Sequence, residues 1–266
     1  MEGAPAWLRP RPVRLRQLPP PDTEQIDMHE TQVCLVVGPC DPLAVRLADR
    51  LHDLGITPVL LEIVWSGDGP DVGRLENRDA EKGIALEKLQ RFPRYSVRAD
   101  EDPQQVIQRV RKLHGAIRGL VYLQPGSPLP QGRPSPIRSD APYLFRVPFL
   151  LAKAVRPFLM EAGESGLGKL WFMTVTRQDG LLGMSGGDDC DPVLGGMGGI
   201  TKSLRAEWSD VFCRSVDLAI EMDADQASAA VVAELLDPNR MIVEVGHGPQ
   251  GRVTLEAVGE ALWPTI

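Results

Sequence analysis

The stretch Gln32-Val33-Cys34-Leu35-Val36-Val37-Gly38 decides the fold class of this 266-residue chain. Consecutive apolar residues, rich in valine, end at a glycine. Such a run, without alternation of polar and apolar residues, is typical of a strand that is buried on both faces of a parallel sheet. A sheet of this kind needs helices on both faces, so the flanking sequence should alternate between helix and strand.

The sequence that follows alternates in this way. Leu43, Leu47 and Leu51 fall at helical spacing, and Gly55 stops that predicted helix before a second apolar strand over residues 59–64. We therefore expect an α/β fold with a doubly wound, mostly parallel sheet and helices on both faces. Further helices are predicted from Asp102-Pro103 and over 144–162, 195–208 and 224–236, and further strands over 119–123, 169–175, 213–218, 241–245 and 252–258.

Residues 1–30 differ from the rest in composition. They hold prolines at positions 5, 10, 12, 19, 20 and 21, and the alternation Val13-Arg14-Leu15-Arg16 favours a short edge strand. The sequence therefore predicts a proline-rich opening segment with an edge strand, residues 1–30, followed by one α/β domain, residues 31–266.

Composition and charge exclude several classes of protein. Hydrophobic residues make up 43% of the chain, which is enough for a core, and the net charge of −7 gives no electrostatic footprint for nucleic acid. We interpret the cluster Arg9, Arg11, Arg14 and Arg16 as a solvated linker or edge strand. No apolar run approaches the roughly 20 residues that cross a bilayer, and no secretory signal is visible, so a cytoplasmic protein without membrane contact is expected.

The four cysteines predict neither a metal site nor a disulfide framework. Cys34, Cys40, Cys190 and Cys213 form no C-x-x-C pair, and no histidine lies at metal-ligand spacing from them. They are expected to be thiols in a reducing compartment.

The turn after the opening strand is a degenerate form of a cofactor loop. Dinucleotide-binding folds carry three glycines here, so that the backbone and a helix N-terminus can approach the pyrophosphate. In Gly38-Pro39-Cys40-Asp41-Pro42 only Gly38 remains, Pro42 lacks an N–H donor, and Asp41 places a negative charge where a phosphate would bind. Glu62, near the end of the second strand, is a weak candidate for a ribose contact.

Two catalytic patterns bear on enzymatic function. Gly183-Met184-Ser185-Gly186-Gly187 fits the G-x-S-x-G elbow of hydrolases, and His247 lies downstream, but no strand leads directly into the motif. His52 and His114 lie near predicted helix C-termini, where capping is the expected role. The second pattern, Tyr-x-x-x-Lys, is absent, because Ala99, Gly126 and Val147 lie four residues after the three tyrosines, which are Tyr95, Tyr122 and Tyr143.

The segment 169–218 carries a resemblance to a known family. LWFMTVTRQDGLLG (residues 170–183) and GGMGGITKSLRAEWSDVFCRSVDL (residues 195–218) resemble the short-chain dehydrogenase/reductase pattern, and more closely the ketoreductase regions of modular polyketide synthases and polyunsaturated-fatty-acid synthases. Residues 244–248 and 251–255 look like the strand that closes this region. The resemblance covers most of residues 10–258 and implies a Rossmann-like fold.

Aligned on Thr201-Lys202-Ser203-Leu204, the chain departs from the reductase pattern at every active-site position. No catalytic residue, cofactor-binding residue or metal ligand is therefore predicted. The family's tyrosine falls on Cys190, its lysine on Leu194, its serine on Arg177 with Thr176 beside it, its helix asparagine near Leu144, and its Asn-Ala-Gly strand end on Leu123-Gln124-Pro125-Gly126.

The resemblance implies the role of the structural, catalytically inactive subdomain of a synthase ketoreductase. In that family the ketoreductase has two Rossmann-like halves, and NADPH binds only to the catalytic half. The implied partners are that catalytic half and neighbouring synthase domains. Two alternatives stay open: a short-chain reductase-like oxidoreductase that uses Cys190 or Asp191 as an unusual acid, and a Ser185 hydrolase.

Overall fold

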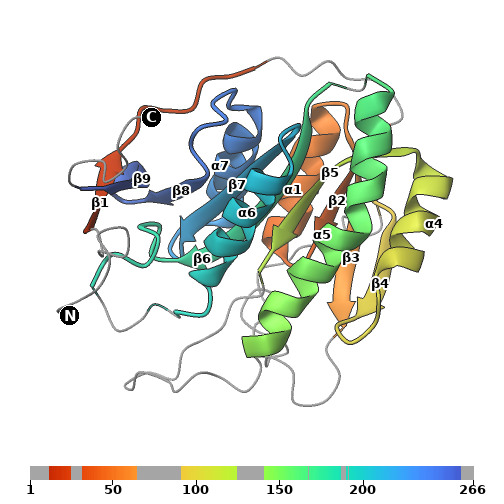
Figure 1. Cartoon of the computed structure of the whole chain (residues 1–266), viewed down its shortest axis with the longest axis horizontal. Helices are drawn as coiled ribbons and strands as arrows, with labels where there is room; N and C mark the ends of the chain where they lie inside the picture. The colour runs from red at the N-terminus through yellow and green to blue at the C-terminus, as the bar shows by residue number, and fades with distance from the viewer. Residues whose placement is uncertain are drawn as a thin grey trace, which may run out of the picture.

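The computed structural model describes residues 12–24, 32–64, 91–124, 141–166, 168–186, 190 and 192–258. Within these ranges a single sheet has the strand order β1-β9-β8-β7-β6-β5-β2-β3-β4 (Figure 1). The strands are β1 (Val13–Gln17), β2 (Gln32–Val37), β3 (Thr57–Val64), β4 (Arg94–Arg98), β5 (Ala116–Leu123), β6 (Leu170–Gln178), β7 (Val211–Ala219), β8 (Glu244–Gly248) and β9 (Gly251–Ala257). The helices are α1 (Pro42–Asp53), α4 (Gln104–His114), α5 (Ala141–Glu164), α6 (Gly196–Glu207) and α7 (Ala224–Leu236).

The central seven strands, β2 to β8, are parallel, as predicted. β2 pairs with β3 on one side and with β5 on the other, so the strand order reverses at β2. Open α/β sheets bind their ligands beyond the carboxyl ends of the strands at this kind of reversal. The fold class is confirmed as a Rossmann-like, doubly wound sheet, and the reversal fixes where a functional site should lie.

Two helical layers cover the sheet, and each buries its own apolar cluster. Leu35 and Val37 of β2 pack with residues of α4, α5 and α6, whereas Cys34 and Val36 pack with residues of α1 and α7. Figure 1 shows α5 and α6 in front of the sheet and α1 and α7 behind it. The continuous apolar run of β2 is therefore explained by burial on both faces.

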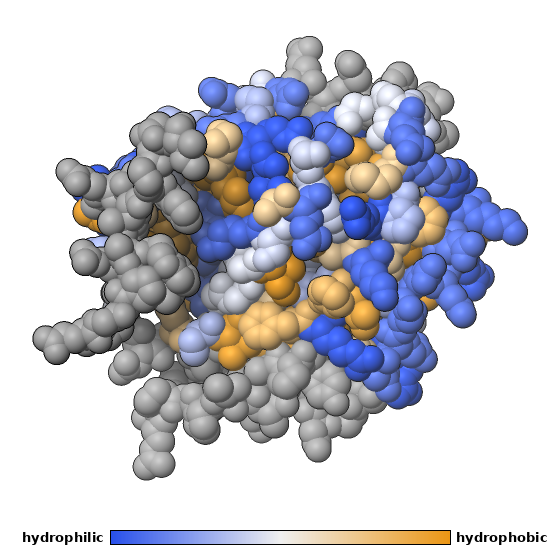
Figure 2. All heavy atoms as spheres, in the orientation of Figure 1, coloured by the Kyte–Doolittle hydropathy of each residue, from blue (hydrophilic) through white to orange (hydrophobic). Residues whose placement is uncertain are grey.

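The outer surface of the α5 layer is mixed rather than apolar. Figure 2 shows hydrophilic residues over much of this face, with apolar residues gathered in its lower central part. Phe149 of α5 is 60% exposed.

No helix in the described part of the chain combines the length and the apolar character that a membrane span needs.

The strand β4 was not predicted. Its residues, Arg94-Tyr95-Ser96-Val97-Arg98, form the outer edge of the sheet, and only Val97 among them is buried. An edge strand with charged, outward-facing residues has little apolar signal. β8 begins at Glu244 rather than at Met241, which is 85% exposed, because the ladder with β7 starts at Ser215 and Glu244.

The predicted edge strand of the opening segment is confirmed as β1. It runs antiparallel to β9 from the pair Val13–Ala257 to the pair Gln17–Val253. Arg14 donates two hydrogen bonds to Glu256, at 2.8 and 2.9 Å, so this arginine lies on an edge strand as expected. Arg9, Arg11 and the predicted boundary at residues 30–31 lie outside the described residues.

Candidate functional site

The candidate site lies where β2, β5, β6 and β7 end, next to the reversal of the strand order. The turn from β2 into α1 holds Gly38 at φ 149°, and a Cβ atom there would lie 2.4 Å from the carbonyl oxygen of Leu123. Gly38 is thus required for the close approach of this turn to β5. The glycine that remains from the cofactor pattern has a packing role.

The N-terminus of α1 is capped by the chain itself. The Asp41 carboxylate accepts a hydrogen bond of 2.9 Å from the backbone N–H of Ala44, and Pro42 occupies the first helical position. A carboxylate at this position satisfies an N–H group and the positive end of the helix dipole that a phosphate would otherwise meet. The negative charge and the missing N–H donor expected from the sequence both lie at this turn, and the structure adds that Asp41 caps the helix.

Glu62 lies on the neighbouring strand and faces a cation. Its carboxylate accepts a hydrogen bond of 3.4 Å from Arg94 of β4. The thiol of Cys40 is partly buried in the same region, and burial together with the nearby Glu62 charge raises its pKa. Glu62 is therefore engaged in an exposed ion pair between β3 and the edge strand β4.

Two rows of polar side chains cross β5, β6 and β7 on the face covered by α5 and α6. The inner row is Tyr122, Thr174 and Ser215, which are register neighbours. Thr174 donates to Ser215 at 3.1 Å, and its hydroxyl lies 2.8 Å from that of Thr201 on α6. Tyr122 is fully buried, its hydroxyl has no hydrogen-bond partner, and burial raises its pKa.

The outer row, closer to the carboxyl edge, is Gln124, Thr176 and Asp217. The backbone N–H of Gln124 donates to Val175, and neither polar atom of its buried side-chain amide has a partner. Thr176 donates a hydrogen bond of 2.9 Å to Asp217. Burial is the main cause that raises the pKa of Asp217 to about 7.

The loop that follows β6 folds around two carboxylates. Asp217 accepts hydrogen bonds from the backbone N–H groups of Gln178 at 3.1 Å and Leu182 at 3.0 Å. Asp179 accepts three more, which come from Leu181, Gly183 and Ser185 at 2.8 to 3.0 Å. Burial opposes ionisation of Asp179, but these N–H groups more than offset it and hold its pKa well below the usual range.

Cys190 and Ser185 lie next to this loop. The Ser185 hydroxyl lies 3.9 Å from the Cys190 sulfur. Burial, and then the negative charge of Asp179, raises the pKa of the Cys190 thiol to about 11. The thiol is therefore protonated at neutral pH and is a poor nucleophile.

The structure does not give Ser185 the geometry of a hydrolase elbow. α6 begins only at Gly196, so no helix follows the serine directly, and positive φ angles in the described part of this loop fall on Leu182 and on Gly180, Gly183 and Gly186 rather than on Ser185. The Nε2 atom of His247 lies 2.7 Å from the carboxylate of Glu234. The strand, elbow and helix that nucleophilic chemistry needs are not assembled here.

The remaining residues that align with the reductase active site serve structural contacts. Arg177 donates to the backbone oxygens of Ile220 and Met222. Leu144 is buried in α5, and Leu194 is buried in the turn before α6. None of these positions carries a phenol or an amine that could protonate a carbonyl oxygen.

The predicted capping histidines lie as expected at helix C-termini. His52 is in the last turn of α1 and packs edge-on against Phe92, and His114 is the last residue of α4, with its Nε2 atom 2.8 Å from the Tyr95 hydroxyl. Asp191 lies outside the described residues. Within the described ranges all four cysteines are free, and no group of histidine, cysteine and acidic side chains is suited to hold a metal ion.

A buried ionic network was missed by sequence reasoning. Fully buried Arg214 of β7 donates to Glu234 and to Asp237, the latter at 2.9 Å. Arg252 of β9 donates to the same two carboxylates and, at 3.0 Å, to the carbonyl oxygen of Pro19. The available signal was a charged residue inside each of two apolar strands, Arg214 in β7 and Arg252 in β9.

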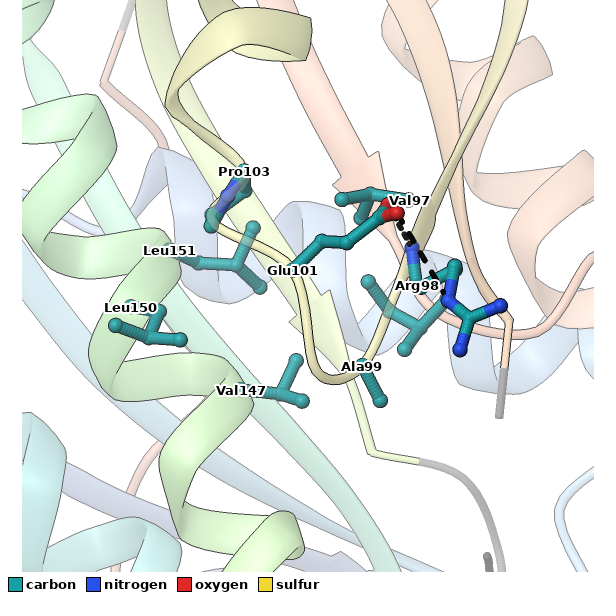
Figure 3. Close-up of a pocket in the computed structure, with 9 residues that line it drawn as sticks. Val97, Arg98, Ala99, Glu101, Pro103, Val147, Leu150 and Leu151 are labelled. Atoms are coloured by element: carbon teal, nitrogen blue, oxygen red, sulfur yellow. Dashed lines mark hydrogen bonds and ion pairs between the residues drawn. The ribbon is translucent and has the colours of Figure 1, made fainter. Parts of the chain in front are cut away.

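A small pocket lies apart from the polar rows, at the connection from β4 to α4. Val147 and Leu151 of α5 form one wall, and Pro103 lies at the start of α4 (Figure 3). Arg98 and Glu101 meet at its rim, where the backbone N–H of Arg98 donates to the Glu101 carboxylate at 3.2 Å. None of the residues that line this pocket belongs to the two polar rows on β5, β6 and β7.

Comparison with known proteins finds similarity in sequence to a synthase subunit. No protein-family profile matches the chain. The chain is 29% identical over 245 residues to one subunit of the polyunsaturated fatty acid synthase from Thraustochytrium sp.. The match covers 90% of this chain, which spans only 8% of the length of that protein.

Solved structures agree on the fold. A 3-ketoacyl-(acyl-carrier-protein) reductase from Brucella melitensis, complexed with NADH, superposes with a TM-score of 0.59 at 14% identity, over 80% of this chain and 94% of that one. A-type ketoreductases from a modular polyketide synthase give a TM-score of 0.53 at 17% identity, over 94% of this chain and 42% of theirs. The chain therefore has the fold of the short-chain dehydrogenases/reductases and is similar in sequence to a segment of a polyunsaturated fatty acid synthase.

Proposed function

We propose that this chain is the structural, catalytically inactive subdomain of a ketoreductase in a fatty-acid or polyketide megasynthase. In this role it scaffolds an NADPH-dependent catalytic half and binds no dinucleotide itself. The observation that carries the proposal is the self-capped N-terminus of α1, where Asp41 and Pro42 stand in an otherwise intact cofactor-binding fold. A bound pyrophosphate would have to displace a carboxylate and would lack one N–H donor.

The side chains around the strand ends support the same role. Hydride transfer to a ketone needs a bound nicotinamide and an acid that protonates the developing oxyanion. At the aligned positions Arg177 is directed to backbone oxygens beyond β7, and Leu194 is buried. Neither can supply the proton, and at the tyrosine position the Cys190 thiol replaces the phenol that the reaction uses.

The extent of the similarity supports a place inside a larger enzyme. The chain covers 42% of the solved polyketide synthase ketoreductases and 8% of the fatty acid synthase relative, while nearly all of its own length is matched. A domain of this kind acts through rigidity. Two apolar layers and a buried ionic network supply that rigidity in this chain.

Cofactor binding tests the proposal directly. NADPH and NADH are titrated separately into the chain in a calorimeter, and no saturable heat is expected at cofactor concentrations up to the millimolar range. A catalytically competent short-chain reductase, titrated in the same buffer, is the positive control. Micromolar binding, followed by reduction of a β-ketoacyl thioester by the isolated chain, would overturn the proposal.

The alternative function is a reductase-like oxidoreductase with Cys190 as its acid. One observation favours it: Cys190 aligns with the catalytic tyrosine and lies beside Ser185, with its thiol protonated. The substitution Cys190→Ala in the full synthase separates the two functions, with Cys213→Ala as the matched control at a buried thiol. Unchanged β-ketoacyl reduction supports the structural role, and loss of activity in Cys190→Ala alone supports the alternative.

A further inference from the structure

We propose that Asp179 and Asp217 form a pH-sensitive latch that holds the loop of residues 179–186 against the carboxyl edge of β6 and β7. This inference goes beyond the proposed function, because it concerns how this loop is held on its own sheet. It rests on the convergence of five backbone N–H groups on two neighbouring carboxyl groups.

Asp217 is the buried half of the latch. Its side chain is almost completely buried at the end of β7, between Thr176 of β6 and the backbone of β8. It accepts hydrogen bonds from the N–H of Gln178, just before the loop, and from the N–H of Leu182, in the middle of it. Through these hydrogen bonds the Asp217 carboxyl group holds the loop against the sheet.

Asp179 is the outer half. It is half-buried and accepts three N–H groups from its own loop, and its negative charge acts on the neighbouring Asp217 carboxyl. Burial, together with the negative charge of Asp179, favours a protonated Asp217 carboxyl over a second negative charge. Asp217 therefore carries a proton when the loop is closed.

The closed loop is also strained. Leu182 has φ 59°, in the left-handed region that leucine adopts only when its surroundings hold it there. Gly180 packs so closely on β8 that a Cβ atom would lie 2.2 Å from the carbonyl oxygen of His247. Loss of the Asp217 proton would place a second negative charge beside Asp179 beneath this strained loop.

Few other titratable groups face the pair. Cys190 lies on the solvent side and is protonated, the His247 ring of β8 pairs with Glu234, and the guanidinium of Arg177 donates to Ile220 and Met222. The register neighbour of Asp217 on β8 is Gly246, which has no side chain. Within the described residues no cation is hydrogen-bonded to either carboxyl group.

The direction of the pH effect follows from linkage. In the closed loop the pKa of Asp217 is raised from 3.8 to about 7, and in an open, hydrated loop it returns toward 3.8. Opening thus releases one proton between these values, so the open population rises by about tenfold for each pH unit there and levels off above about 7. Below about 4 the lowered pKa of Asp179 reverses the sign, so the latch is tightest in weakly acidic solution.

Amide hydrogen exchange measures the latch in the intact chain. Protection factors for the N–H groups of residues 181–185, corrected for intrinsic exchange rates, are followed from pH 4.5 to 8 in the wild type. They should fall by about tenfold per pH unit up to pH 6.5 and then level off. In Asp217→Asn the profile should be flat, and in Asp210→Asn, an exposed turn residue, it should match the wild type.

A second readout needs no variant. Carbon-13 NMR of the aspartate side-chain carboxyls in the wild type should show one group that titrates close to pH 7. A wild-type protection profile without slope, or a buried aspartate that titrates near 4, would overturn the proposal even if Asp217→Asn fails to fold. An Asp217→Asn variant that folds and keeps the wild-type slope would also overturn it.

Discussion

The substitution Glu234→Gln tests the buried ionic network. The Glu234 carboxylate has no exposed surface and accepts hydrogen bonds from the guanidinium groups of Arg214 and Arg252, while His247 lies 2.7 Å away. Glutamine keeps the shape but leaves two buried cations with one carboxylate, that of Asp237. Breaking a buried pair in this way costs about 3–5 kcal/mol. For a chain of this size, the melting temperature should fall by roughly 6–20 °C.

The assay is urea unfolding at neutral pH, followed by circular dichroism and by tryptophan fluorescence to check that one transition is seen. The matched control is Glu207→Gln, an exposed residue at the end of α6, which should change the free energy of unfolding by less than about 0.5 kcal/mol. If Glu234→Gln loses no more stability than this control, the network does not stabilise the fold and the reasoning is refuted.

Three further predictions follow from the described contacts. Gly119→Ala would place a Cβ atom 2.0 Å from the Trp171 ring in a strand buried on both faces, so a loss of about 1–3 kcal/mol is expected in the same urea assay, and wild-type stability would contradict it. Asp41→Ala removes the cap on the Ala44 N–H and should cost about 0.5–2 kcal/mol, while Asp41→Asn should cost less; equal losses would argue against a capping role. Burial opposes ionisation of Glu234, but His247 and the two arginines lower its pKa from 4.5 to about 2, so its contribution is complete above 4.5 and is lost as the pH falls through 2. Acid unfolding of Glu234→Gln should therefore be shallower than that of the wild type over this range, and identical slopes would show that the carboxylate is not the group involved.

The fold could be predicted because its central strands are unambiguous. A strand such as β2, apolar on both faces, has few alternatives, and α7 (Ala224–Leu236) has the predicted bounds because Asp223 forms a capping box with Gln226. β4 could not be predicted, since an edge strand with Arg94 and Arg98 on its exposed side owes its structure to pairing with β3.

The candidate site could be predicted only where a residue acts locally. Asp41 caps the helix that follows it, so the four residues from Asp41 to Ala44 contain the whole interaction. The pair Asp179 and Asp217 joins segments 38 positions apart, and its proximity depends on the register between β6 and β7. The same is true of Arg214 and Arg252, whose partners lie on α7 and just beyond it.

The pairing of β1 with β9 has a mechanical consequence. Val13 and Ala257 are opposite each other at the outer end of an antiparallel pair, so tension applied to the flanking chain pulls both strands apart from the same end. Hydrogen bonds loaded in this direction break one after another, at much lower force than bonds sheared together. Separation would proceed from Val13 to Gln17 and then meet Arg252, whose guanidinium is tied to Glu234, Asp237 and Pro19. Under tension β1 and β9 would therefore separate first. The buried ion pairs of Arg252 would resist further separation before it reaches the parallel strands.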